Sequence, residues 1–61
     1  IGMIKIIYKH WKKDKTLEVT GTLPSELNNG SSERLVVRTP DGLFEDVLKN
    51  TVITIEEVDT D

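Results

Sequence analysis

The segment from Tyr8 to Lys15 combines aromatic rings with positive charge. Its aromatic and cationic members fall within eight positions, and they are Tyr8, Lys9, His10, Trp11, Lys12, Lys13 and Lys15. Aromatic faces beside cations stack on the bases of single-stranded nucleic acid. The same cations attract an acidic segment of another protein. Since the cluster lacks arginine, the usual reader of phosphates and bases, we predict a protein partner first and nucleic acid second.

The predicted contact residues are Tyr8, Lys9, Trp11, Lys12, Lys13 and Lys15. A purely structural interpretation is also open for this segment. In that interpretation the lysines form a turn that keeps a hairpin soluble, while Tyr8 and Trp11 cover the edge of the core.

A group of carboxylates lies toward the other end of the chain, and its members are Glu45, Asp46, Glu56 and Glu57. Successive strand residues point to opposite faces, so Glu45 and Asp46 cannot act together as an acid and a base. We predict a solvated acidic surface. The alternatives are docking on a basic protein patch and imitation of DNA phosphates.

The composition offers few residues that could support catalysis or bind a metal ion. The chain contains no cysteine and only one histidine, His10. A catalytic triad, a zinc site and a disulfide framework are therefore not expected. We predict a protein that is not an enzyme and that needs no cofactor or metal.

Charge is unevenly distributed along the 61 residues, whose net charge is −3. Residues 1–16 carry five lysines against one aspartate, a balance of +4, and residues 17–61 carry three cations against ten carboxylates, a balance of −7. A net acidic chain is a poor general binder of phosphate backbones. No run approaches the ~20 apolar residues of a membrane span, so we expect a cytoplasmic protein without a membrane partner.

The elements that position these side chains are expected to be strands, because Thr, Val and Ile are frequent in the chain and favour strands. Alternation of apolar and polar residues predicts five strands, at 3–11, 16–23, 34–39, 43–47 and 52–58. In the first strand Ile4, Ile6 and Tyr8 share the better core face. Gly21 predicts a bulge or bend in the second strand, and Pro24 ends it.

Three connections complete the predicted fold. Residues 25–32 are polar and read as a loop, which Leu27 would anchor to the core. The tetrapeptide 39–42, Thr-Pro-Asp-Gly, predicts a type I turn in which Gly42 is left-handed. Residues 48–50 fit one 3₁₀ turn before the last strand.

These strand lengths and connections predict a single all-β domain over residues 3–58: a small antiparallel barrel or a strongly curled sheet. Closure into a barrel would remove exposed strand edges. Ile1 and Gly2 are interpreted as the remnant of a cleaved tag, and residues 59–61 as a frayed tail.

The strand pattern with its 3₁₀ turn at 48–50 resembles the Src-homology-3-like and Sm-like small barrels. The segments 42–47 and 53–56 are similar to YolD-like proteins of Gram-positive bacteria and their phages. These resemblances imply a bacterial accessory protein, encoded by a phage or mobile element. We predict a non-enzymatic module that binds a protein, with nucleic-acid binding or self-assembly through strand edges as alternatives.

Overall fold

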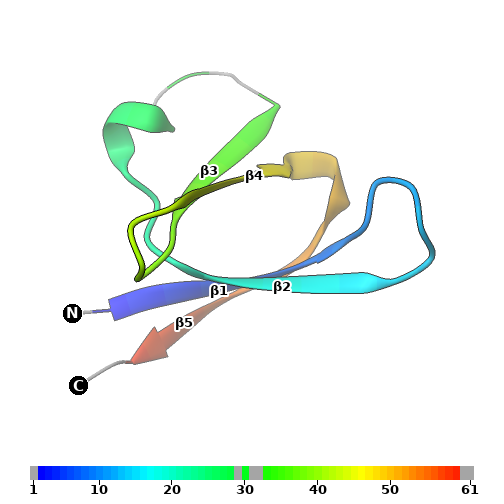
Figure 1. The fold of residues 1–61 in the computed structure, drawn as a ribbon, viewed down its shortest axis with the longest axis horizontal. Coiled ribbons are helices and arrows are strands. Elements are labelled where there is room, and N and C mark those ends of the chain that lie inside the picture. The colour runs from blue at the N-terminus through cyan, green and yellow to red at the C-terminus, as the bar shows by residue number, and fades with distance from the viewer. Residues whose placement is uncertain (1, 29, 31–32, 60–61) are drawn as a thin grey trace.

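The structure is a computed structural model and describes residues 2–28, 30 and 33–59. The described chain is all-β, as predicted, and its only helical segments are two single 3₁₀ turns. In chain order the elements are β1 (Gly2–Lys9), β2 (Thr16–Gly21), η1 (Ser25–Leu27), β3 (Arg34–Arg38), β4 (Phe44–Leu48), η2 (Lys49–Thr51) and β5 (Val52–Asp59) (Figure 1).

The strands form two antiparallel sheets. The first has the order β2-β1-β5, and the second is the hairpin of β3 and β4, which lies over the first in Figure 1. Ile6 of β1 pairs with Val19 of β2 and with Ile55 of β5. Since paired residues share a face, these three side chains point toward the hairpin.

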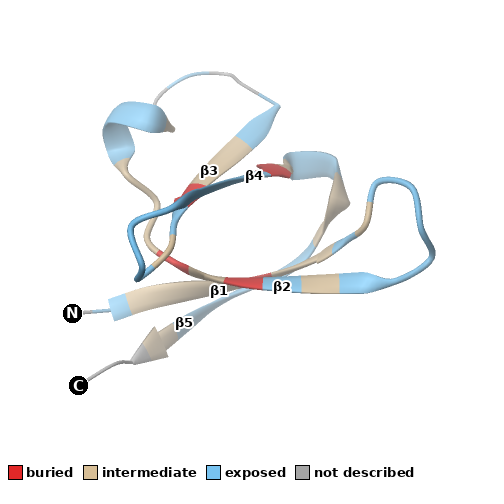
Figure 2. Cartoon of the chain, in the orientation of Figure 1, coloured by how far each residue is buried: buried red, intermediate tan, exposed pale blue. Residues whose placement is uncertain are grey.

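A small hydrophobic core lies between the two sheets. Its buried members are Ile6, Val19, Val37 and Val47 (Figure 2). Partly buried side chains pack around them, namely Ile4, Tyr8, Leu23, Leu35 and Val52. The predicted core face of the first strand is therefore confirmed.

Gly21 forms the corner at which the chain leaves the first sheet for the second. The next residue, Thr22, exchanges two backbone hydrogen bonds with Arg38, of 2.9 and 3.0 Å. A β-carbon on Gly21 would lie 2.2 Å from the Arg38 carbonyl oxygen, which is closer than atoms can approach. The predicted bend is confirmed, and its cause is this close backbone approach.

The turn between β3 and β4 has the predicted geometry. The Gly42 N–H donates to the Thr39 carbonyl at 2.9 Å, and Gly42 has a φ of +86°. The predicted 3₁₀ turn before the last strand is also present as η2, where the Thr51 hydroxyl donates to the Leu48 carbonyl at 2.6 Å.

The prediction of a closed barrel is not confirmed. Among the described residues the isolated bridge between Thr22 and Arg38 joins the two sheets, and no ladder joins β4 to β5. The turn η2 places β5 against β1, while β4 stays paired with β3. Each of β4 and β5 thus has one edge outside the ladders.

Two predicted boundaries need correction at the chain ends. Gly2 belongs to β1 and pairs with Asp59, so it is part of the sheet rather than a segment outside the fold, and Asp59 belongs to β5. Ile1 and residues 60–61 lie outside the described residues.

Two further predictions were wrong inside the chain. Residues 25–27 form the 3₁₀ turn η1 instead of irregular loop, because the N–H groups of Leu27 and Asn28 reach back to Pro24 and Ser25. A single such turn needs no apolar repeat. Leu27 does not anchor this segment, since it is 46% exposed.

Candidate binding site at the basic turn

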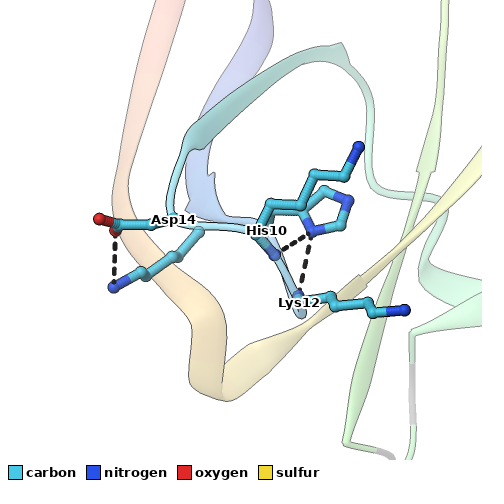
Figure 3. Close-up of polar contacts among 5 residues, drawn as sticks. His10, Lys12 and Asp14 are labelled. Atoms are coloured by element: carbon cyan, nitrogen blue, oxygen red, sulfur yellow. Dashed lines mark hydrogen bonds and ion pairs between the residues drawn. The ribbon is translucent and has the colours of Figure 1, made fainter.

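The basic turn, residues 10–15, connects β1 to β2 and is organised by His10. The His10 Nδ1 atom accepts the N–H groups of Lys12 at 3.0 Å and Lys13 at 2.9 Å (Figure 3). The His10 N–H also donates to the Lys15 carbonyl at 2.9 Å. An accepting Nδ1 needs a free lone pair, which the Nε2–H tautomer of neutral imidazole provides. The ring thus fixes the backbone of a turn that has no apolar residue except Trp11.

Trp11 projects from this turn into solvent and is 74% exposed. Its ring stacks on His10, with centroids 5.9 Å apart and planes inclined by 19°. The Lys12 Nζ atom lies 5.7 Å from the indole centroid, within the range of a cation–π contact. The interpretation of Trp11 as a cover of the core is wrong, because β1 ends at Lys9 and the indole that follows is largely exposed.

The basic turn and the end of β1 carry four lysines, of which Lys12 lies over the indole. Lys9 lies 3.5 Å from Asp14, but both side chains are well exposed, so this ion pair contributes little to stability. Lys12, Lys13 and Lys15 are exposed and form no ion pair within the described part of the chain. Their charges remain available to a partner.

A shallow hollow of about 230 Å³ lies between the basic turn and the segment from β4 to η2. Tyr8, Lys9 and Trp11 line one side of it, and Leu48 and Thr51 line the other. A second hollow, of about 410 Å³, is lined by Trp11, Leu48, Arg34 and Asp46. Trp11, Leu48 and Asp46 thus border both hollows, so the indole lies beside one apolar and one acidic side chain of β4.

Tyr8 joins the core to this surface. It packs against the core from β1 and also lines the first hollow. Burial of the phenol raises the pKa of Tyr8 above its ordinary value, and the negative charge of Glu45 raises it further. The structure therefore brings Tyr8, Lys9 and Trp11 together, with Lys12 over the indole, while Lys13 and Lys15 occupy the rest of the turn.

The four predicted acidic residues do not form one patch. Asp46 lies on the outer face of the hairpin, 3.6 Å from Arg34, and borders the Trp11 hollow. Glu56 lies on the outer face of the first sheet, 3.9 Å from Lys5. Glu45 and Glu57 belong to the inner faces, as their pairing with Val37 and Ile4 shows. Glu45 and Asp46 point to opposite faces, as predicted.

Six residues outside the predicted contact set also line these hollows: His10, Leu17, Arg34, Asp46, Leu48 and Thr51. Leu48 was assigned to a connecting turn, yet it ends β4 beside Trp11. Arg34 begins β3 at the same end of the molecule. No local signal in the sequence places them near the turn, because their proximity depends on how the hairpin crosses the first sheet.

Comparison of the chain with protein-family models, with curated proteins and with solved structures gave no match. Within residues 2–28, 30 and 33–59, no three side chains of His, Cys, Asp or Glu gather into a group that could hold a metal ion. Neither 3₁₀ turn of the described chain has the length or apolarity to cross a membrane.

Proposed function

We propose that this chain is a small non-enzymatic binding module that recognises an acidic segment of another protein through the basic turn. The observation that carries the proposal is the exposure of Trp11, at 74%, on a turn whose backbone is fixed by His10. Exposing an indole has a hydrophobic cost, and burying it against a partner recovers that cost. A fixed turn also loses little conformational entropy on binding.

The surroundings of Trp11 favour a ligand that is both acidic and partly apolar. Lys12, Lys13 and Lys15 offer positive charge, while Leu48 and Tyr8 offer apolar surface in the hollow beside the indole. The carboxylate of the same hollow, Asp46, is paired with Arg34. Buried tryptophans ringed by polar groups are common centres of protein interfaces. The hollows are open to water, whereas catalysis requires a base or nucleophile positioned in a shielded pocket.

Fluorescence anisotropy with defined peptides tests the proposal. The probe is a labelled peptide of glutamate and leucine, and its twin carries glutamine in place of glutamate. We expect the acidic peptide to bind at least tenfold more tightly than its twin, with an affinity that falls as salt is added. Trp11→Ala should weaken binding about tenfold, which corresponds to about 1.4 kcal/mol. Lys12→Glu should weaken it as well.

Two matched variants control for general effects of the substitutions. Leu43→Ala removes another exposed apolar side chain, and Arg38→Glu makes a charge reversal at the far end of the hairpin. Both should bind the acidic peptide within about twofold of the unmodified protein. Equal affinity for the two peptides, or an equal loss in Leu43→Ala and Trp11→Ala, would refute the proposal.

Nucleic acid is a second candidate, and the stacked rings of His10 and Trp11 favour it. An exposed indole backed by an imidazole and flanked by Lys12 offers an aromatic face on which a single base can stack. In the same assay a labelled oligothymidine replaces the peptide. Binding that exceeds peptide binding at equal salt, and that Trp11→Ala abolishes, would select this candidate. No oligonucleotide binding at low salt would exclude it.

We also infer that the two sheets are the halves of a small open barrel of the Src-homology-3-like class. The strand order through the Thr22 bridge, β5-β1-β2-β3-β4, supports this inference. The Gly21 corner and the 3₁₀ turn between the last two strands support it too. The resemblance favours an accessory protein of a bacterium or phage.

A further inference from the structure

The β5 strand has one edge that no other described strand pairs with. It is the outer strand of the sheet β2-β1-β5 and runs for eight residues. The outer edge of β3, by contrast, has hydrogen-bond partners. Thr22 bridges to Arg38, and the Asn28 side chain bonds both backbone groups of Val36. An edge strand left open in this way is a template for an added strand.

Half-exposed isoleucines lie along this open edge. Ile55 pairs with the fully buried Ile6, so it belongs to the core-facing side of the sheet, yet it is 50% exposed. Ile53, at the irregularity of the pairing with β1, is 55% exposed. Figure 2 shows the middle of β5 exposed while the facing strands contain buried residues. A strand added beyond β5 would cover this apolar surface.

Carboxylates outnumber cations in the segment from β4 to β5, where η2 contributes the single lysine, Lys49. Strands β4 and β5 together carry five carboxylates and neither lysine nor arginine. Glu56 is paired with Lys5, and Asp46 with Arg34. Glu45 and Glu57, both on inner faces, form no ion pair among the described residues.

We propose that the free edge of β5 binds an extended cationic peptide by strand addition. On the core-facing side of the sheet an apolar side chain of the peptide would lie beside Ile55, and a lysine or arginine two residues away would lie beside Glu57. A hollow of about 550 Å³ adjoins Glu57 and is otherwise lined by Val58 and by residues 2–4 of β1.

A second copy of this chain fits the edge poorly. Antiparallel pairing of two β5 strands would bring Glu56 and Glu57 of both copies into one short ladder, and pairing with β4 of another copy would add Glu45 and Asp46. Like charges opposite each other destabilise a strand pair. A basic partner strand meets no such repulsion, and this site lies on a different surface from the basic turn.

Peptide binding followed by fluorescence anisotropy tests this proposal. The probe is a labelled peptide of about nine residues with valine and lysine alternating on one face and threonine on the other. One twin carries glutamate for lysine, and another carries a central proline, which cannot donate to a ladder. We expect the lysine peptide to bind at least tenfold more tightly than either twin, and to shift the amide resonances of residues 53–57.

Variants of the protein locate the binding. Glu57→Lys should weaken binding of the lysine peptide at least tenfold, and Glu57→Gln by a smaller factor. Glu26→Lys makes the same charge change on η1 and should stay within twofold. Similar binding of the lysine and glutamate peptides, an equal loss in Glu26→Lys and Glu57→Lys, or dimerisation through β5 without peptide binding would overturn the proposal. If Trp11→Ala, rather than Glu57→Lys, weakens binding of the lysine peptide, the peptide binds at the basic turn and the proposal is overturned.

Discussion

Asn28 offers the sharpest test of what holds this fold together. Its Nδ2 group donates to the carbonyls of Pro24 at 2.9 Å and Val36 at 3.0 Å, and its Oδ1 accepts the Val36 N–H at 2.9 Å. The side chain therefore makes the two hydrogen bonds to Val36 that a neighbouring strand would make at the outer edge of β3. It also ties the segment after β2 to the second sheet. We expect Asn28→Ala to loosen both connections.

The expected loss follows from these three bonds. A hydrogen bond contributes about 1 kcal/mol net, so complete loss of three would cost about 3 kcal/mol. The site is partly buried, and water can replace some of the lost partners. We therefore expect a loss of about 2 kcal/mol, out of the roughly 3–9 kcal/mol typical of a chain of this length. The melting temperature should fall by about 8–16 °C.

Urea unfolding followed by circular dichroism measures this loss. With a slope of about 1 kcal/mol per molar urea, the midpoint should fall by about 2 M. Asn28→Asp keeps the acceptor but loses both donated bonds, so it should be at least as unstable. Asn50→Ala, on the exposed turn η2, is the matched control and should change stability by less than about 0.5 kcal/mol. If Asn28→Ala is no less stable than Asn50→Ala, the side chain does not hold the edge of β3 as argued.

Three further predictions concern other positions. Gly21→Ala should cost about 3 kcal/mol in urea unfolding, because its β-carbon would meet the Arg38 carbonyl, whereas Gly2→Ala meets no atom within 4 Å and should be neutral. Gly42→Ala should cost about 1 kcal/mol in the same assay, owing to the φ of +86°. Burial and Glu45 raise the pKa of Tyr8 in the folded chain, so the unfolded chain ionises first and stability should fall as pH rises above about 10. The stability of Tyr8→Phe should therefore fall less above this pH than that of the unmodified protein. An equal fall in both proteins would contradict this prediction.

Local chemistry made much of the fold predictable. Alternation of apolar residues located the strands, and the residue types around Gly42 specified a turn whose backbone angles the structure reproduces. Gly21 marked a bend, although the sequence could not say that the Arg38 carbonyl causes it. Closure of the sheet into a barrel was not predictable, because it depends on whether β4 and β5 lie close enough to pair. No local sequence pattern specifies the distance between these two strands.

The basic turn illustrates the same limit at the candidate site. The residue types of the turn are evident from the sequence, but the alternation of residues 3–11 predicts a strand that includes Trp11. The strand ends two residues earlier, since His10 bonds the N–H groups of Lys12 and Lys13 and so bends the backbone. A histidine shortly before a run of charged residues, as His10 is before residues 12–15, indicates such a turn only weakly. The approach of Leu48 to the indole, by contrast, is a product of tertiary packing alone.

The small core explains why side chains that bond to the backbone matter so much here. The four buried hydrophobic side chains of the described chain, all Ile or Val, supply limited stabilisation. The chain therefore fixes its turns and one strand edge with polar contacts: His10 in the basic turn and Asn28 at β3. The apolar side chains that the core cannot enclose, Trp11 and Ile55 among them, remain at the surface beside charges of opposite sign. Limited burial in the fold and the exposure of apolar side chains at the two proposed binding surfaces thus have the same physical origin.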